Sequence, residues 1–317
     1  MTHEFQSIVN QAKIWQSQGK PMVLATVVEI EGSSYRRPGV RMILTEEGES
    51  VGAVSGGCVE KEVHFQSLSV IEDGKPKMMS YDGTLRLGCE GIIYVLLEPF
   101  ELSDNFIKAF ELAIKNRILM KIQASYQKEF GVFDDIGSCI IIDNQTFVFN
   151  KNYSPKNNQL LFKQELPPLF QLIIIGAEHD AVQLTKAASG IGWKVIVIAS
   201  ADEQKSINFF PGAVDFQTPF FEDIDTTVVD KQTAIVLMTH SFNKDVQYLL
   251  AFNNCYPAYF GLLGPQHRKE RLISQLLELN PEVDFEFIDQ LRGPSGINIG
   301  AESAQEIAIS KIGRAHV

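Results

Sequence analysis

The stretch VSGGCVE, residues 54–60, places a cysteine directly after two glycines and two positions before a glutamate. Glycines accept positive φ angles and let a ligand approach the backbone closely. The surrounding residues have the form strand, glycine turn, helix, so Cys58 is expected in the first turn of a helix. Unpaired N–H groups and the helix dipole favour a thiolate there and can also seat an oxyanion. The stretch predicts a reactive thiol; the alternative is a small apolar residue at a strand–helix junction.

A second cysteine has a similar setting. Cys89 lies in RLGCEGIIYV, between Gly88 and the pair Glu90–Gly91, just before an apolar run. Two glycine-flanked cysteines in one domain could share one pocket, and the alternative is two unrelated buried thiols. Cys139, inside SCIIID, is expected in the core.

Three arginines, Arg36, Arg37 and Arg41, surround the turn signal Pro38–Gly39. Guanidinium groups suit phosphate or carboxylate, because their N–H donors form a planar fork. The arginines therefore predict an anion site near the first cysteine, and the alternative is a solvated arginine cluster.

The second half of the chain contains a strand, turn and helix that are typical of a dinucleotide site, but the fingerprint is incomplete. That fingerprint is G-x-G-x-x-G/A, with an acidic residue about 20 positions later. After Gly176, Glu178 replaces the middle glycine, and its carboxylate would repel a pyrophosphate. Ala199 stands where the ribose-binding acid is expected, and Asp202 lies three residues later. We predict that NAD and NADP do not bind tightly.

Polar residues also follow the expected strands of this half. Thr239 and His240 follow one strand at its carboxyl end, and His179 follows the first strand on the same edge. Ligands of parallel sheets gather at this edge. The two histidines could form a metal or acid–base site with Glu178, Asp180 and Asp245, and the alternative is a set that braces the loops.

Composition excludes several classes of protein. The net charge of −11 argues against a nucleic-acid partner, which usually needs a basic surface. No apolar run approaches the ~18 residues of a membrane span. The N-terminus has no long apolar run, so we expect no signal peptide and a cytoplasmic protein. The four cysteines show no C-x-x-C spacing, which argues against a structural zinc site or a disulfide framework.

The elements that must position these residues fall into two halves. The first half is predicted to be α+β. Its expected helices are residues 4–18, 58–71 and 103–117. Its expected strands are residues 22–30, 41–45, 50–55 and 91–98, followed by two or three short strands up to residue 150. In the second half, strands at 172–176, 193–199, 233–240 and 258–264 alternate with helices. This alternation predicts a parallel, doubly wound sheet.

The predicted domains follow from this division. Residues 1–150 form the first domain, residues 151–168 a polar linker, and residues 169–310 the second domain. The final residues, KIGRAHV (311–317), do not continue the helical pattern of SAQEIAIS, because Gly313 interrupts it. We expect them to be an artefactual tail.

The motifs resemble those of a known family. GSSYRRPGVRM, GAVSGGCVE, LGCEG and VLLEP resemble the N-terminal domain of the xanthine dehydrogenase accessory factor family, also called the XdhC/CoxI family. IIIGAEHDA, FFPGAVDF, AIVLMTH, YFGLLGPQHRKERL and INIGAESAQEIAIS resemble its C-terminal Rossmann-type domain. The resemblance covers nearly the whole chain in the same order.

The resemblance implies a maturation factor that is a cofactor chaperone rather than an enzyme. Such a protein binds the molybdenum cofactor, a molybdopterin, and supports its sulfuration and its insertion into an apo molybdenum hydroxylase of the xanthine dehydrogenase type. A cysteine desulfurase is a further expected partner, and a homodimer is the expected assembly. The two motif cysteines fall on Cys58 and Cys89; the family's second motif usually has Cys-Gly-Gly, where this chain has Cys89-Glu90-Gly91.

The expected site has two parts. Cys58 and Cys89 carry the sulfur chemistry and are the candidate ligands of molybdenum. The cofactor-binding residues are expected to be Arg37, Arg41, Ser55, Gly56, Gly57, Cys58, Glu60, Gly88, Cys89, Gly91, Gly176, His179, Thr239 and His240. We expect the two parts to face each other across a cleft, within one chain or across a dimer. The alternatives are an NAD(P)-dependent oxidoreductase and a thiol-dependent sulfur-transfer enzyme that uses Cys58.

Overall fold

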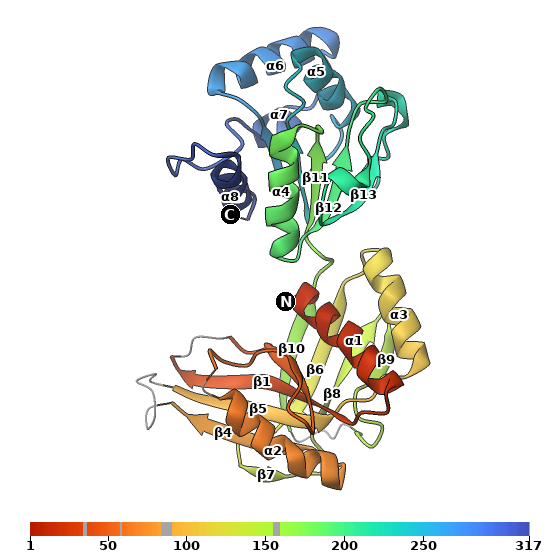
Figure 1. Ribbon diagram of the computed structural model, residues 1–317, viewed down its shortest axis with the longest axis vertical. Coiled ribbons are helices and arrows are strands. Elements are labelled where there is room, and N and C mark those ends of the chain that lie inside the picture. Colours follow the sequence, from red (N-terminus) through yellow and green to blue (C-terminus); the bar gives the residue numbers. More distant parts are fainter. Residues whose placement is uncertain (34–36, 58, 84–90, 155–158, 317) are drawn as a thin grey trace. The chain divides into compact units, whose positions relative to one another are not determined.

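The computed structural model describes residues 1–33, 37–57, 59–83, 91–154 and 159–316. The chain divides into two compact units, Met1–Pro168 and Leu169–Val317 (Figure 1). The first unit is α+β and the second has a parallel sheet of the Rossmann type, as the sequence predicts. Within the described part of the chain, no helix is both long and apolar enough to cross a membrane.

The described residues of the first unit form two antiparallel sheets and three helices. The larger sheet has the order β3-β2-β1-β5-β4-β7, with β1 (Met22–Gly32), β2 (Arg41–Thr45), β3 (Ser50–Gly52), β4 (Lys77–Asp82), β5 (Gly91–Pro99) and β7 (Gly131–Val132). The smaller sheet has the order β10-β6-β8-β9, with β6 (Met120–Tyr126), β8 (Gly137–Ile142), β9 (Gln145–Val148) and β10 (Leu160–Leu166). The helices are α1 (Thr2–Ser17), α2 (Glu60–Asp73) and α3 (Asp104–Lys115).

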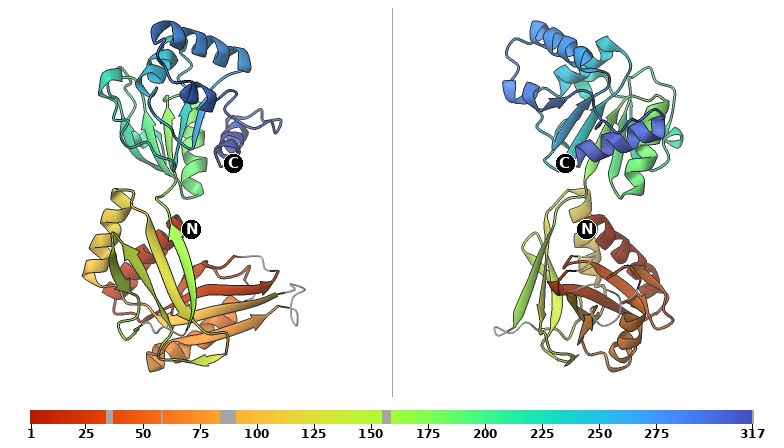
Figure 2. Two further views of the ribbon diagram at one scale, coloured as in Figure 1. Left: turned by 180° about the vertical axis from the view of Figure 1, so that it is seen from behind. Right: turned by 90° about the vertical axis from the view of Figure 1, so that its left-hand side faces the viewer.

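Strand β5 shows how the first core is assembled. Its side chains alternate between the two faces of the sheet, as in any strand. Val95 and Leu97 pack with buried residues of α2, whereas Tyr94 and Leu96 pack with residues of β6. Figure 2 shows the ribbons of the two sheets and of α2 in this unit. Both faces of this strand are therefore buried, which explains its continuous apolar run.

The prediction of a linker over residues 151–168 is corrected for part of that range. Residues 160–166 form β10, which pairs antiparallel with β6 along its whole length. Most side chains of β10 are exposed or partly exposed, as is usual for an edge strand. This strand has no apolar alternation in its sequence, because it needs no buried face, and sequence periodicity could not reveal it.

The second unit is a doubly wound sheet with the order β13-β12-β11-β14-β15-β16, and all its pairings are parallel. Its strands are β11 (Gln171–Ile175), β12 (Lys194–Ile198), β13 (Ala213–Gln217), β14 (Thr233–Leu237), β15 (Tyr259–Leu262) and β16 (Leu291–Arg292). Its helices are α4 (His179–Gly190), η1 (Ile207–Phe209), η2 (Phe221–Asp223), α5 (Phe242–Ala251), α6 (Gln266–Leu279), α7 (Phe285–Gln290) and α8 (Ala304–Ala315). The strand order reverses between β11 and β14, which is where such sheets bind ligands.

Helix α8 extends further than the sequence predicts. It continues through Gly313 to Ala315, so the prediction that this glycine interrupts the helix is wrong. A glycine in a helix costs roughly 1 kcal/mol relative to alanine. Packing of α8 against α4, with Ala308 and Ala315 buried, offsets that cost. The artefactual origin of residues 311–317 stays a prediction.

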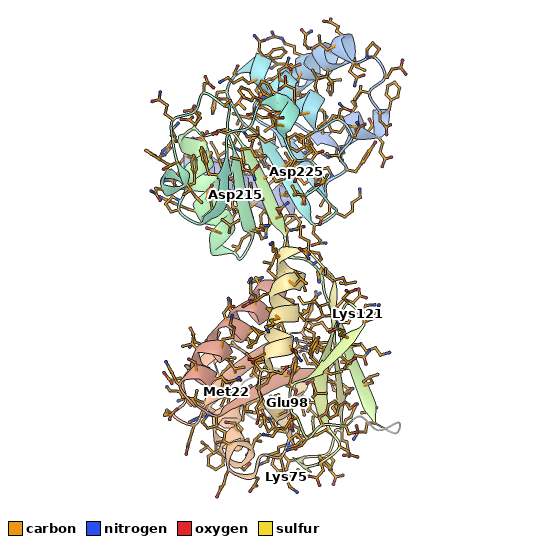
Figure 3. All side chains as sticks on the ribbon, turned by 90° about the vertical axis from the view of Figure 1, so that its right-hand side faces the viewer. Met22, Lys75, Glu98, Lys121, Asp215 and Asp225 are labelled. Carbon is orange, nitrogen blue, oxygen red and sulfur yellow. The ribbon has the colours of Figure 1, made fainter. Side chains whose placement is uncertain are left out.

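A carboxyl group and a guanidinium group, those of Glu98 and Arg41, are buried in the first unit. Glu98 of β5 is fully buried (Figure 3), and its carboxylate accepts hydrogen bonds from the Ser138 backbone N–H at 2.8 Å and from the Ser138 hydroxyl. Arg41 of β2 is 6% exposed, and its Nη1 donates to the Gly39 carbonyl at 2.8 Å and to Gln164. Burial raises the pKa of Glu98 to about 7 and lowers that of Arg41 to about 10, and the charge of each group opposes the other's shift.

This burial makes stability depend on pH. Between pH 4.5, the ordinary glutamate pKa, and about pH 7, the folded protein keeps a proton on Glu98 that the unfolded chain has lost. The free energy of unfolding should therefore fall as pH rises through this window, by at most about 3 kcal/mol. The variant Glu98→Gln should flatten that part of the curve, because an amide does not ionise. Urea unfolding at several pH values measures the slope.

Glu111→Gln is the control for this prediction, because Glu111 is an exposed glutamate of α3. It should keep the wild-type pH dependence. If Glu98→Gln kept it too, the raised pKa of Glu98 would not be its cause.

Candidate functional site

The glycine turn between β3 and α2 is held by one carboxylate. Glu60 is the first residue of α2, and it accepts hydrogen bonds from the Ser55 backbone N–H at 2.8 Å and from the Ser55 hydroxyl at 2.6 Å. The Ser55 hydroxyl oxygen in turn accepts from the N–H groups of Gly57 at 3.1 Å and Val59 at 3.2 Å. Ser55 and Glu60 thus fix the shape of the turn, which is a role that sequence reasoning did not assign to them.

The charge of Glu60 follows from this geometry. Partial burial alone would raise its pKa, but the hydrogen bonds from Ser55 and from backbone N–H groups outweigh burial and lower it. A carboxylate in the first turn of a helix also interacts favourably with the helix dipole. Helix α2 begins at Glu60, so the prediction of a helix start at residue 58 is corrected by two residues.

The two glycines of the turn lie clear of the other described residues, apart from their chain neighbours. Gly57 has φ +116°, a left-handed conformation that favours glycine. Apart from its chain neighbours, a Cβ atom built on Gly56 or Gly57 would meet no atom of the described residues within 4 Å. A ligand can therefore approach this backbone closely. Cys58 itself lies outside the described residues.

The other residues of the first unit that were predicted to bind the cofactor do not form one group with the glycine turn in the described part of the chain. Gly91 begins β5, and a Cβ atom there would lie 2.4 Å from the Ser33 carbonyl oxygen, so strand pairing requires this glycine. Arg37 is exposed, whereas Arg41 points into the interior and bonds to Gly39 and Gln164. Gly88 and Cys89 lie outside the described residues.

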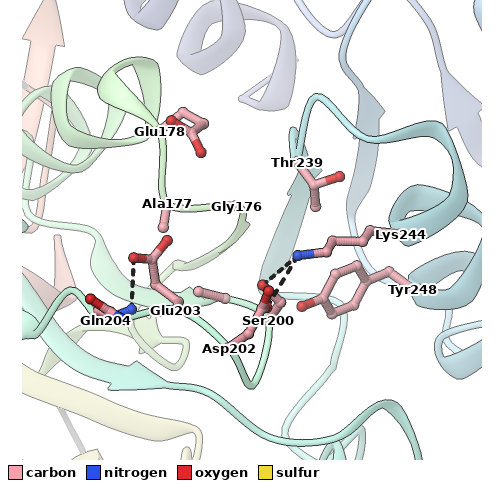
Figure 4. Close-up of a pocket in the computed structure, with 11 residues that line it drawn as sticks. Gly176, Ala177, Glu178, Ser200, Asp202, Glu203, Gln204, Thr239, Lys244 and Tyr248 are labelled. Carbon is pink, nitrogen blue, oxygen red and sulfur yellow. Dashed lines mark hydrogen bonds and ion pairs between the residues drawn. The ribbon is translucent and has the colours of Figure 1, made fainter.

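The second unit has a pocket at the carboxyl ends of β11, β12 and β14, here called the rim pocket (Figure 4). Its volume is about 270 Å³, and it is lined by Gly176, Ala177, Glu178, Ala199, Ser200, Asp202, Glu203, Gln204, Thr239, Lys244 and Tyr248. Gly176 has φ +130°, and a Cβ atom there would lie 2.6 Å from the Met238 carbonyl oxygen. Only glycine lets β11 and β14 end this close together.

The rim pocket contains two of the four residues that the sequence predicts on this edge. Gly176 and Thr239 line it, whereas His179 and His240 are exposed and are not among the lining residues. His240 has a left-handed backbone with φ +57°.

The metal hypothesis is not supported where the structure can be assessed. In the described ranges, no group of three or more His, Cys, Asp or Glu side chains could hold a metal ion. Asp245 is 1% exposed and accepts from the Thr239 hydroxyl at 2.6 Å and from Arg268 Nη2 at 2.7 Å. This network favours the alternative interpretation for Asp245 and Thr239, a set that braces the loops.

Sequence reasoning missed most of the polar groups in the rim pocket. Lys244 of α5 donates from Nζ to the Ser200 hydroxyl at 2.9 Å and to the Asp202 carboxylate at 3.2 Å (Figure 4). Asp202 lies three residues after the position expected for the ribose-binding acid of a dinucleotide site. A turn after β12 nevertheless brings it to the rim pocket. Tyr248 is four residues after Lys244 on α5, and this spacing could have shown that the two share a helix face.

The Tyr248 hydroxyl is the unusual group of this pocket. Tyr248 is 1% exposed, and its hydroxyl has no hydrogen-bond partner among the residues that the structure describes. Figure 4 shows the hydroxyl directed toward Ser200 and Asp202. Burial, followed by the charges of Asp202 and Asp245, raises the pKa of Tyr248 to about 12, so it is a neutral donor at neutral pH. An unpaired buried hydroxyl costs roughly 1–3 kcal/mol.

The charge and size of the rim pocket limit what it can hold. Three carboxylates, Glu178, Asp202 and Glu203, line it together with one ammonium group, that of Lys244. This surplus of negative charge opposes a pyrophosphate. A volume of about 270 Å³ is near the lower end of ligand sites, which span ~300–1,000 Å³. The pocket therefore suits one ring system better than a whole dinucleotide.

Two protein-family models match the chain. The model described as the XdhC and CoxI family matches residues 15–82, which include the glycine turn. The model described as the XdhC Rossmann domain matches residues 172–313, which include the rim pocket.

Similar proteins match both units together. A Bacillus subtilis (strain 168) protein, named as a probable subunit of xanthine dehydrogenase, is 31% identical over 92% of this chain and 91% of its own length. The molybdenum cofactor insertion chaperone PaoD of Escherichia coli (strain K12) is 26% identical over 98% of this chain and 87% of its own. A crystal structure described as a xanthine dehydrogenase from Bacillus halodurans has a TM-score of 0.79 and 27% identity, and it covers 96% of this chain and 94% of its own.

The acidic rim pocket generates a prediction about nucleotides. We expect no binding of NAD(H) or NADP(H) tighter than about 100 μM in calorimetry of the whole chain. The variant Glu178→Gly restores the middle glycine of the fingerprint and removes one carboxylate, so its affinity should rise. Micromolar binding by the wild-type protein would contradict the argument from Glu178 and Ala199.

Proposed function

Because the chain belongs to the XdhC and CoxI family, we propose that it binds the molybdenum cofactor and supports its insertion into a molybdenum hydroxylase of the xanthine dehydrogenase type. The observation that carries this proposal is the match with a molybdenum cofactor insertion chaperone over 98% of the chain. Both units take part in that match, so the whole chain is proposed to act as the carrier. Its role is to hold and release a cofactor rather than to turn over a substrate.

The glycine turn fits the expected cofactor. Among the described residues, nothing but chain neighbours would meet a Cβ atom on Gly56 or Gly57, and this supports a site for a bulky group at the glycine turn. A cysteine thiolate is a good ligand for a soft metal, and we propose that Cys58 supplies it. The bound group would bring a molybdenum centre and a molybdopterin with a phosphate. Glu60 would keep the turn in one shape before and after the cofactor leaves, because its hydrogen bonds are internal to the protein.

Two further parts of the proposal concern partners. We propose that the chain protects the cofactor while a cysteine desulfurase provides the sulfur for its sulfuration, with Cys89 as the second thiol. We also propose a homodimer as the working assembly. The client enzyme would be an apo molybdenum hydroxylase that accepts the cofactor from the chain.

The proposal predicts the behaviour of a Cys58→Ala variant. Wild-type protein purified from cells that make the cofactor should contain molybdenum and pterin, whereas Cys58→Ala should contain at least about tenfold less, because the variant lacks the metal ligand. The variant should remain folded, since alanine is smaller than cysteine and the hydrogen bonds that hold the turn come from Ser55 and Glu60. Metal analysis and pterin fluorescence measure both components.

Cys255→Ala is the matched control, because Cys255 is a buried cysteine of the second unit. It should retain the cofactor as the wild type does. Alkylation of the native protein provides a second readout, since burial raises the pKa of the Cys139 and Cys255 thiols and slows their reaction. Cofactor-free wild-type protein, or equal alkylation rates for Cys58 and Cys139, would count against the proposal.

A further inference from the structure

We propose that the rim pocket binds the 2-amino-4-oxopyrimidine edge of a bicyclic heterocycle, the edge that a pterin and a guanine share. This edge presents two adjacent N–H donors, from the amino group and the ring nitrogen, followed by a carbonyl acceptor. The choice of a pterin as the natural source rests on the proposed function. The pocket chemistry itself does not depend on it.

The donors that would meet the carbonyl are Tyr248 and Lys244. The Tyr248 hydroxyl is buried, lines the pocket and lacks a partner among the described residues. Buried polar groups of folded proteins nearly always have a hydrogen-bond partner, so a ligand oxygen is the expected acceptor. The Lys244 ammonium carries three N–H donors, two of which are accepted by Ser200 and Asp202.

The acceptor that would meet the two N–H groups is Asp202. Its carboxylate lies beside the Lys244 ammonium at 3.2 Å and is close enough to Tyr248 to influence its titration. A carboxylate has two oxygens side by side, which matches two adjacent N–H donors. Hydrogen bonds, first from Ser200 and then from Lys244, lower the pKa of Asp202, so it is ionised and acceptor-only at neutral pH.

The neighbouring residue Glu203 keeps this arrangement in place. Its carboxylate accepts from the backbone N–H groups of Gln204 at 2.9 Å and Lys205 at 3.0 Å. The Glu203 backbone N–H also donates to the Ser200 carbonyl at 2.9 Å, and this bond closes the turn that contains Asp202. Glu203 also contributes negative charge, which disfavours a phosphate inside the pocket. The ligand is thus inserted by its neutral ring, with any phosphate outside.

Calorimetry of the whole wild-type chain tests this assignment with two pairs of ligands. The probes are 6-hydroxymethylpterin and guanosine, and the matched controls are 6-hydroxymethyllumazine and inosine. The lumazine has an oxo group in place of the 2-amino group, and inosine lacks that amino group, so each control loses one N–H donor site. We expect at least one probe to bind, and its control to bind about tenfold more weakly.

Substitutions that change one polar group of the protein test its recognition of the 2-amino-4-oxopyrimidine edge. Tyr248→Phe removes only the hydroxyl and should weaken binding about five- to tenfold. Asp202→Asn replaces an acceptor with an amide donor and should weaken it at least about tenfold. Tyr256→Phe is the control, because the Tyr256 hydroxyl bonds to Asp284 outside the rim pocket, and it should bind as the wild type does.

The outcomes separate this inference from the proposed function. Binding of the pterin that becomes about five- to tenfold weaker in Tyr248→Phe supports both. Binding of guanosine but not of the pterin supports the edge and assigns it to a nucleoside instead of the molybdenum cofactor. If neither probe binds, or if binding is equal in wild type and Tyr248→Phe, the inference is overturned, whereas cofactor retention through Cys58 is unaffected.

Discussion

The burial of both faces of a central sheet is the constraint on which the rest of this structure depends. In the first unit, β5 packs against α2 on one face and against the second sheet on the other. In the second unit, α4 and α8 cover one face of the parallel sheet, and α5 and α6 cover the other. Side chains within such strands are committed to packing. Chemistry is therefore left to the ends of the strands, which is where the glycine turn and the rim pocket lie.

The same burial determines which polar groups are structural and which are left for a ligand. Glu98 and Asp245 are buried carboxylates, and each accepts hydrogen bonds from neighbouring residues. Tyr248 is buried equally well, but its hydroxyl has no partner in the described part of the chain. An unsatisfied buried group costs free energy, so among the described residues that line the rim pocket this difference distinguishes Tyr248.

The sequence predicted the strands that have a clear apolar pattern. It missed the features that depend on contacts between residues far apart in the chain. Apolar runs located β1, β5 and β11, because strands buried on both faces contain little else. Strand β10 was missed, since an edge strand with an exposed face has no such pattern. Arg41 was predicted to bind an anion, with a solvated arginine as the alternative, but the side chain is buried and bonds to Gln164 of the second sheet, which is a property of the folded unit. Asp202 and Tyr248 meet only after the turn that follows β12. The predicted thiol at Cys58 lies outside the described residues, so it stays a prediction.

The central claim is that this chain carries the molybdenum cofactor and passes it to a client. Its most direct test is a transfer experiment, in which purified chain loaded with cofactor is mixed with an apo molybdenum hydroxylase and the two are then separated. The account predicts that molybdenum and pterin leave the chain together and appear in the hydroxylase, with hydroxylase activity rising in proportion. If the cofactor stays on the chain, or if free cofactor activates the hydroxylase equally well without it, the account is contradicted.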